Sequence, residues 1–353
     1  MGRNKNIELY RSIFLFSVII HHIYILAGCT VKNWLLHNAI NLGGEIGVTG
    51  FFILSGFGIY CNWSKNEKTS IREFMGKRMK RLLPQYYVGL IMAIFVGNGV
   101  IILNGHALKD ILTHILFIHN LWPSTHGTIN GALWTMGVIV QFYFISKPLY
   151  LLVKRYRIYV VGIAVAISVL SKFIMFHFIL IPLEQSGIYY FIYGRQLWSA
   201  IDNFVLGMYL AYKWNVASDE RNGLLKGGMI FASIGVLGGA WIAISGKYSY
   251  AIYTDSWWGY SWHSLTAAAL CIVMSCTIGI DTLAQNIVGK FLLWMSKYEY
   301  GIYIWHLLII NNLLNNSQLI QNIQNTSRLS LIPILGVITI GIGAVMTKSL
   351  EGA

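Results

Sequence analysis

The chain contains 353 residues, of which 56% are hydrophobic and only 11% are charged. This charged fraction is about half of what soluble globular domains carry, so a soluble enzyme is excluded and an integral membrane protein is predicted. The net charge of +13 does not indicate nucleic-acid binding, because no basic helix or RNA-binding signature accompanies it. We expect the charge to reflect membrane topology and contact with anionic lipid headgroups.

A helix needs about 20 apolar residues to cross the ~30 Å hydrocarbon core of a bilayer. Ten runs meet this need and predict an all-α bundle of about ten transmembrane helices: 10–29, 45–62, 82–104, 132–152, 157–179, 196–213, 225–244, 263–280, 298–315 and 330–348. The shorter run 111–122 predicts a partial or surface-lying helix. No Pro/Ser linker or low-complexity segment divides the chain, so we expect one membrane domain over residues 1–353.

The loops between these runs differ in basic content. If the N-terminus lies inside, the inner segments carry most of the lysines and arginines, and each outer loop carries one: Lys32, Lys109, Arg195, Lys247 and Arg328. The positive-inside rule then predicts that both termini are cytoplasmic and that the protein is a multi-pass protein of the cytoplasmic (inner) membrane.

The first run carries the most unusual polar residues. Arg11 and His22 are eleven positions apart, close to three helical turns, so they share a face about 16 Å apart along the axis. His21 is turned from that face by roughly 80°. Ionisable residues inside a span are functional candidates by default, and neutral histidine suits proton transfer. The alternative is a histidine that bridges helices, with Arg11 extending its guanidinium to the interface.

The second run contains GVTGFFILSGFGIY (47–60), in which four glycines and Ser55 form a small-residue surface. Such a surface allows close helix packing or a backbone approach to a ligand. No phosphate-loop lysine follows these glycines, which excludes a soluble nucleotide fold. Glu45, at the start of the run, is a further intramembrane ionisable candidate.

At the start of the third run, RMKRLLPQYY (78–87) places Arg78 and Arg81 at i and i+3, on one helical face. Two guanidiniums there are suited to phosphate groups. The alternative is a topology signal, because every inner loop is basic. Asp202 and His306 are the remaining intramembrane ionisable candidates. The four cysteines show neither metal-ligand spacing nor a disulfide framework, and we predict no metal site.

Taken in order, these segments resemble the acyltransferase-3 family of integral membrane O-acyltransferases. The resemblance rests on five features: Arg11-x10-His22, GVTGFFILSGFGIY, FMGKRMKRLLPQYY, FVLGMYLAY (204–212) and SKYEYGIYIWH (296–306). A sixth segment, LWTMGVIVQFY (133–143), is similar to the family's WSLxxExQFY. Trp134, Gln141 and Tyr143 match it, but Ile139 occupies the glutamate position. Any role of that acid is therefore in doubt here.

The resemblance implies transfer of an acyl group, most simply acetyl, from cytoplasmic acetyl-CoA or another acyl-CoA to a hydroxyl of a cell-surface polysaccharide or glycolipid. It implies no permanently bound cofactor. His22 would be the base or a transient acyl carrier, with Arg11 steering the thioester, and Arg78 and Arg81 would bind the CoA phosphates. Further site candidates are His306, Tyr143, Trp134, Gln141, Ser55, Asp202 and Glu45.

The alternative function is a multi-pass secondary transporter or lipid-linked-sugar flippase. Transporters often contain an internal repeat, and none is evident here, since the histidine and arginine features lie in the first hundred residues. Because the sequence stops soon after the tenth run, we expect no C-terminal esterase-like domain. We then expect acceptor delivery within the membrane domain or by an envelope-biosynthesis partner protein.

Overall fold

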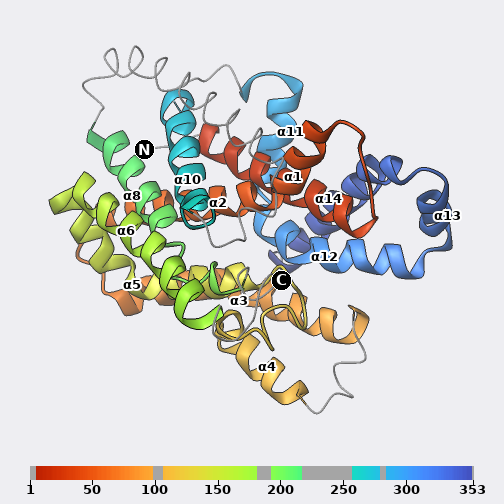
Figure 1. The fold of residues 1–353 in the computed structure, drawn as a ribbon, viewed down its shortest axis with the longest axis horizontal. Helices are drawn as coiled ribbons and strands as arrows, with labels where there is room; N and C mark the ends of the chain where they lie inside the picture. Colours follow the sequence, from red (N-terminus) through yellow and green to blue (C-terminus); the bar gives the residue numbers. More distant parts are fainter. Residues whose placement is uncertain (1–4, 98–105, 181–191, 217–256, 279–283, 352–353) are drawn as a thin grey trace. The chain divides into compact units, whose positions relative to one another are not determined.

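The computed structural model describes residues 5–97, 106–180, 192–216, 257–278 and 284–351, and this part of the chain contains helices and loops but no strand (Figure 1). The predicted all-α class is confirmed. Within the described ranges, five segments are long and apolar enough to cross a membrane: Lys5–Leu26, Trp34–Lys65, Trp134–Tyr156, Ile158–Ile179 and Arg328–Leu350. The chain is thus built as a multi-pass membrane protein, and the predicted number of about ten spans stays a prediction. The predicted run 225–244 lies outside the described residues.

The described residues fall into two compact units. The first comprises residues 1–7, 48–73 and 138–281, and the second comprises 8–47, 74–137 and 282–353. Helices α1 (Lys5–Leu26), α2 (Trp34–Lys65), α3 (Ile71–Met92) and α5 (Trp134–Tyr156) contribute residues to both units.

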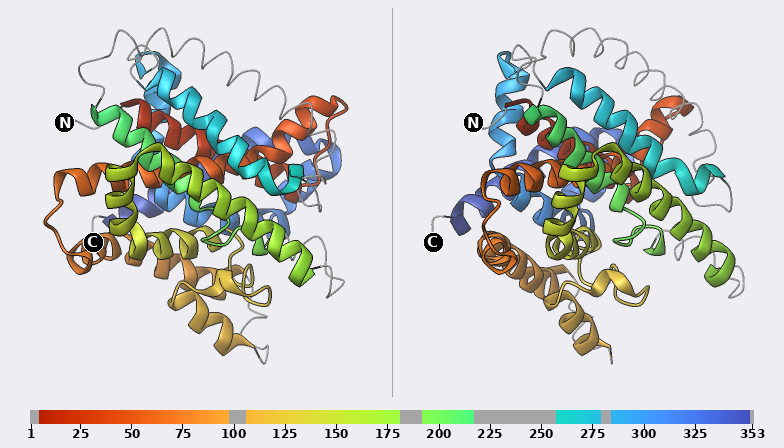
Figure 2. Two further views of the ribbon diagram at one scale, coloured as in Figure 1. Left: turned by 60° about the vertical axis from the view of Figure 1, so that its left-hand side comes forward. Right: turned by 90° about the vertical axis from the view of Figure 1, so that its left-hand side faces the viewer.

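The first unit adds α6 (Ile158–Met175), α8 (Ile201–Val216) and α10 (Trp257–Thr277), which lie side by side (Figure 2). Its core is aromatic: the rings of Phe142 and Phe204 stack with centroids 4.0 Å apart. Helices α2 and α8 cross very closely, because a Cβ at Gly56 would meet the Phe204 carbonyl and one at Gly207 would meet the Ile53 carbonyl. Helix packing therefore accounts for at least part of the glycine-rich surface.

The second unit contains α4 (Ala107–Ile115), α11 (Ile287–Ser296), α12 (Glu299–Asn316), α13 (Gln318–Thr326) and α14 (Leu331–Glu351). The predicted partial helix over 111–122 is found only in part, because α4 ends at Ile115 and a separate 3-10 turn covers His119–Leu121. With nine residues, α4 is too short to span a bilayer. Helix α12 packs against α14, and the side of α12 that carries Gly301 accepts Thr347 and Gln85 where a Cβ would otherwise lie.

Candidate active site

Helix α1 presents Arg11 and His22 to the same neighbour, α12. Arg11 Nη1 lies 2.9 Å from Glu299 Oε2, and His22 Nδ1 lies 3.1 Å from His306 Nε2. The predicted common face of Arg11 and His22 is thereby confirmed. Glu299 and His306 are about two turns apart on α12, or ~10 Å along its axis. The Arg11–Glu299 ion pair and the His22–His306 pair therefore lie one after the other along the interface between α1 and α12.

The hydrogen bonds of the two imidazoles assign their tautomers. His306 Nδ1 faces the Tyr303 carbonyl, which only accepts, so this nitrogen carries the proton. In a neutral His306, Nε2 is then an acceptor for the Nδ1–H of His22. The same Nδ1–H also faces the Val18 carbonyl at 3.0 Å. The assignment makes Nε2 the basic nitrogen of His22, the form that a general base requires.

Residues 130–135 brace this part of α12. The Tyr303 hydroxyl donates to the Ala132 carbonyl at 3.2 Å and lies 2.9 Å from Thr135 Oγ1, while Asn130 Nδ2 donates to the Ile304 carbonyl at 3.1 Å. Trp134, a candidate of the matching WSLxxExQFY segment, is buried at the start of α5 beside this brace. Its segment therefore supports the turn of α12 that leads to His306.

His21 lies in a different environment. Its Nδ1 is 3.2 Å from the Ile40 carbonyl, and a Cβ at Gly44 would lie 2.5 Å from its Cδ2, so α2 is shaped to accept this ring. This contact supports a packing role for His21. Glu45, the next residue of α2, is buried at 7% exposure.

Helix α3 carries Arg78 and Arg81 towards the same end of α12 as Glu299. The Tyr300 hydroxyl donates to the Leu82 carbonyl at 2.9 Å, and Gly89 accepts the Ile304 side chain where a Cβ would lie. Arg81 directly precedes Leu82, and Glu299 directly precedes Tyr300. Arg78 stacks over Phe74 with its guanidinium carbon 5.3 Å from the ring centroid, and Arg81 is exposed.

The remaining candidates belong to the first unit. Ser55 precedes Gly56 at the α2–α8 crossing, and Gln141 and Tyr143 lie on α5, where the Tyr143 carbonyl accepts from Ser146 Oγ at 2.7 Å. Ile139, at the position of the family glutamate, is half-buried on the same helix.

Asp202 is fully buried on α8, where it accepts a hydrogen bond from Ser264 of α10. Lys172 on α6 is also fully buried, and its ammonium donates to Ser168 Oγ at 3.2 Å. Asp202 and Lys172 are close enough for their charges to influence each other, and α6, α8 and α10 pack together around them. A hydrogen-bonded carboxylate buried between helices fits a structural role for Asp202.

Sequence reasoning missed Lys172 and Glu299. A signal existed for Lys172, because it stands well inside the run 157–179 and is ionisable. Glu299 stands at the boundary of run 298–315, where charged residues are common and do not indicate a site. Only the fold reveals its ion pair with Arg11. Within the described ranges, no cluster of three or more His, Cys, Asp or Glu side chains is arranged to hold a metal ion.

Comparison with known proteins identifies relatives over most of the chain. It is 25% identical to the peptidoglycan O-acetyltransferase OatA of Listeria monocytogenes serovar 1/2a, over 76% of this chain and 45% of that protein. It is 23% identical to the O-acetyltransferase OatA of Staphylococcus aureus strain NCTC 8325, over 85% of this chain and 49% of that protein. The chain spans about half the length of the curated relatives it matches.

No solved structure matches the chain. A family model described as an acyltransferase domain matches residues 4–348, which is nearly the whole sequence. The chain therefore belongs to the acyltransferase-3 family.

Proposed function

We propose that the protein is a membrane O-acetyltransferase that moves an acetyl group from cytoplasmic acetyl-CoA to a hydroxyl of a cell-envelope glycan or glycolipid. Family membership supports acyl transfer, and the relatives named as O-acetyltransferases support acetyl as the group. One of them is named for peptidoglycan, which makes a polysaccharide of this class the first acceptor to test.

The observation that carries the proposal is the imidazole pair. His22 Nδ1 is held by the Val18 carbonyl and by His306 Nε2, and the ring is half-buried on a helix whose length suits a membrane span. A general base that removes a proton from an alcohol works best when its pKa lies near the working pH, and the imidazole of histidine meets this requirement at neutral pH.

In the direct reaction, His22 Nε2 takes the proton of the acceptor hydroxyl while its oxygen attacks the thioester carbonyl. The tetrahedral intermediate collapses, the C–S bond breaks, and the thiolate of CoA takes the proton back from Nε2. The products are the acetyl ester and CoA thiol. In the alternative, Nε2 attacks the thioester carbonyl, the C–S bond breaks, and CoA leaves as the thiolate while Nε2 carries the acetyl group. The acceptor oxygen then attacks the acetyl carbon, the C–N bond breaks, and the hydroxyl proton balances the CoA thiolate as its thiol. His306 stabilises the charged His22 in either route through its Nε2 lone pair.

The arginines supply the binding half of the reaction. Arg11, Arg78 and Arg81 belong to elements that meet the end of α12 near Glu299, about two turns from His306. CoA phosphates bound by these guanidiniums would direct the thioester towards the imidazole pair.

This reaction fits a protein of about ten spans with both termini in the cytoplasm, embedded in the inner membrane. In that topology the basic residues of α3 face the compartment that holds acetyl-CoA. A separate envelope-biosynthesis protein is the natural partner for presenting the acceptor.

The test supplies acetyl-CoA labelled in its acetyl group to membranes that contain the protein, and follows the label into envelope glycans. Wild-type membranes should label the glycan. In His22→Ala membranes the rate of transfer should fall at least about a hundredfold, which is the lower end of what a general base contributes. A short incubation without acceptor, followed by acid quenching, distinguishes an acetyl-histidine from direct transfer.

His106→Gln serves as a matched control, because this histidine is exposed at the start of α4 and should leave transfer unchanged. Full activity of His22→Ala together with loss in His21→Ala would reject His22 as the base. A label that never leaves CoA, while a solute accumulates in vesicles, would favour the transporter alternative.

A further inference from the structure

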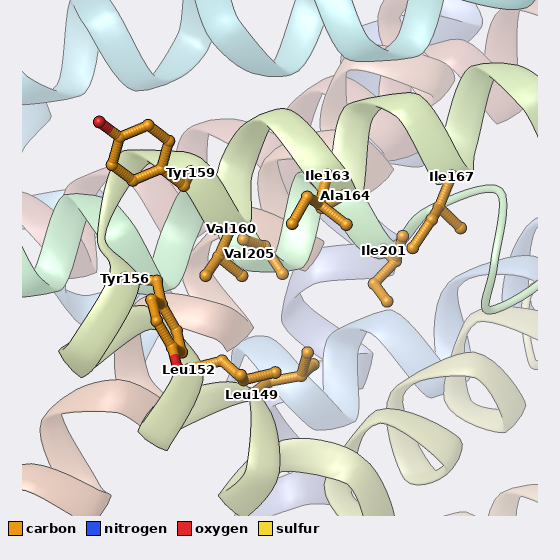
Figure 3. Close-up of a pocket in the computed structure, with 10 residues that line it drawn as sticks. All are labelled: Leu149, Leu152, Tyr156, Tyr159, Val160, Ile163, Ala164, Ile167, Ile201 and Val205. Atoms are coloured by element: carbon orange, nitrogen blue, oxygen red, sulfur yellow. The ribbon is translucent and has the colours of Figure 1, made fainter.

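An apolar groove runs along the first unit between α5, α6 and α8 (Figure 3). Its volume is about 360 Å³, and every residue that lines it has a hydrocarbon or aromatic side chain. Leu149 and Leu152 come from α5, Ile163 and Ile167 from α6, and Ile201 and Val205 from α8. Ile163 is 60% exposed and Ile167 is 42% exposed, so the groove opens to the outside of this unit.

The length of the groove matches one leaflet of a bilayer. On α6 the lining extends from Tyr159 to Ile167, about 12 Å of helix, which approaches half of the ~30 Å hydrocarbon core. Because Ile158–Ile179 is long and apolar enough to span a membrane, hydrocarbon chains would surround its exposed face. A groove of this length suits the acyl chain of a glycerophospholipid, whereas a long polyisoprenoid chain would extend far beyond it.

The end of the groove at the α5–α6 turn is aromatic and basic. Tyr156 and Tyr159 line this end, as Figure 3 shows, and the turn also carries Arg155 and Arg157. Arg155 lies over the Tyr156 ring at 5.2 Å, and Arg157 lies over the Tyr212 ring at 5.8 Å. Tyrosine and arginine in this arrangement are typical of the interface between hydrocarbon and headgroups.

The charges of these two arginines are not neutralised by a neighbouring acid in the described part of the chain. The adjacent Lys154 does pair with a carboxylate, that of Glu67, at 2.8 Å. Arg157 also has a φ of 55°, a conformation that glycine would adopt without steric cost. An arginine in that position keeps a guanidinium at the α5–α6 turn, next to the tyrosines that line the groove, at the expense of backbone strain.

We propose that this groove binds one anionic glycerophospholipid of the adjacent leaflet, with an acyl chain along α6 and the phosphate on Arg155 and Arg157. The apolar lining accepts the chain, and the two guanidiniums select a negatively charged headgroup over a zwitterionic one. Such a lipid would join α5, α6 and α8 from outside. The inference is independent of the chemistry proposed for His22.

The test uses the full chain purified in detergent and freed of lipid. Phosphatidylglycerol or phosphatidylcholine with identical acyl chains is added, and bound lipids are counted by native mass spectrometry. Phosphatidylglycerol should bind at least about tenfold more tightly, and Arg155→Gln/Arg157→Gln should abolish that preference. Ala164→Leu, which fills the groove, should weaken binding of both lipids, and the exposed Ile163→Asn provides a second groove variant if the first fails to fold.

Lys68→Gln/Arg72→Gln is the matched control, because it also removes two charges from an exposed part of the first unit, at the α2–α3 connection. This variant should keep the preference for phosphatidylglycerol. Equal affinity for the two lipids, or an equal loss in the control variant, would overturn the proposal. Tighter binding of a polyisoprenyl phosphate than of phosphatidylglycerol would also overturn it, in favour of a carrier-lipid site.

Discussion

His22 of α1 and His306 of α12 face each other with ring centroids 4.9 Å apart and planes inclined by 47°. Their separation in sequence is 284 positions, and their nitrogens lie 3.1 Å apart. The contact fixes the tautomer of the His22 ring through its Nδ1. We therefore predict that His306 positions and stabilises His22 and does not itself contact the substrate.

The first prediction concerns this positioning role. His306→Ala should lower kcat for glycan acetylation at least about tenfold and leave the KM for acetyl-CoA nearly unchanged, because orienting groups act on the transition state. The pH profile of kcat should also shift, since the His22 Nδ1–H would lose one of its two acceptors and keep only the Val18 carbonyl. His306→Gln should recover part of the rate, because its amide oxygen can accept that bond. A purely structural role would instead show as lost folded protein with a normal pH profile.

The second prediction concerns Glu299, which holds the Arg11 guanidinium at α12. The side chains are 31% and 14% exposed, so the pair adds no more than about 1 kcal/mol to stability. Glu299→Ala should nevertheless raise the KM for acetyl-CoA several-fold, because the arginine loses its fixed position, and Glu299→Gln should restore most of the affinity. Steady-state kinetics at varied acetyl-CoA measure this.

Glu67→Ala is the control for that experiment. It breaks another exposed ion pair, with Lys154, that lies on neither α1 nor α12. Its KM should equal the wild-type value. If Glu67→Ala and Glu299→Ala raised KM equally, the Arg11–Glu299 contact would have no particular part in binding acetyl-CoA.

The third prediction tests the close α2–α8 crossing. A Cβ at Gly207 would overlap the Ile53 carbonyl, a backbone atom that cannot move without separating the helices. Gly207→Ala should therefore destabilise the protein by at least about 3 kcal/mol, the upper range for overpacking. Gly162→Ala on α6 meets no atom within 4 Å, and it should be neutral or stabilising by up to about 1 kcal/mol. Thermal unfolding in detergent compares the two, and equal midpoints would contradict the crossing.

The sequence was sufficient to predict the helical class, the membrane environment and the common face of Arg11 and His22. These depend on local properties, namely composition and the 3.6-residue period of a helix. A short helix that cannot span also followed from the run 111–122, although α4 begins four residues earlier and ends at Ile115.

The partners across helices could not be predicted in the same way. That Glu299 contacts Arg11 and Ser264 donates to Asp202 depends on which helices are neighbours, and nothing in a single sequence specifies those neighbours. His306 was a candidate because it is ionisable within a span, but its contact with His22 is visible only in the fold. The need for glycine at positions 56 and 207 likewise becomes clear only when the close contact of α2 with α8 is known.

The final prediction concerns three buried histidines in the segment between α3 and α5, outside the membrane-spanning helices. The rings of His114 and His119 stack with centroids 3.9 Å apart. Burial lowers the pKa of His114 to about 4 and that of His126 to about 4, and burial together with the neighbouring His114 lowers the pKa of His119 to about 2. All three rings are therefore neutral in the folded protein at pH 5 to 7.

The sign of the pH dependence follows from these shifts. An unfolded histidine has a pKa of about 6.5, so between about pH 6.5 and pH 4 the unfolded chain binds protons that the folded chain does not. The free energy of unfolding should consequently fall as the pH is lowered from about 6.5, by up to about 1.4 kcal/mol per pH unit for each histidine. Thermal midpoints measured in detergent from pH 7.5 to 4.5 would show this loss.

His119→Phe separates this effect from general acid sensitivity. Phenylalanine can keep the stack on His114 without a titratable group, so the decline in the thermal midpoint below pH 6.5 should become shallower than in the wild-type protein. His106→Gln, at an exposed histidine a few residues earlier, should leave the slope unchanged because that side chain is solvated in both states. An unaltered slope in His119→Phe would mean that other groups cause the acid sensitivity, since the stacked ring would then titrate alike in the folded and unfolded chains.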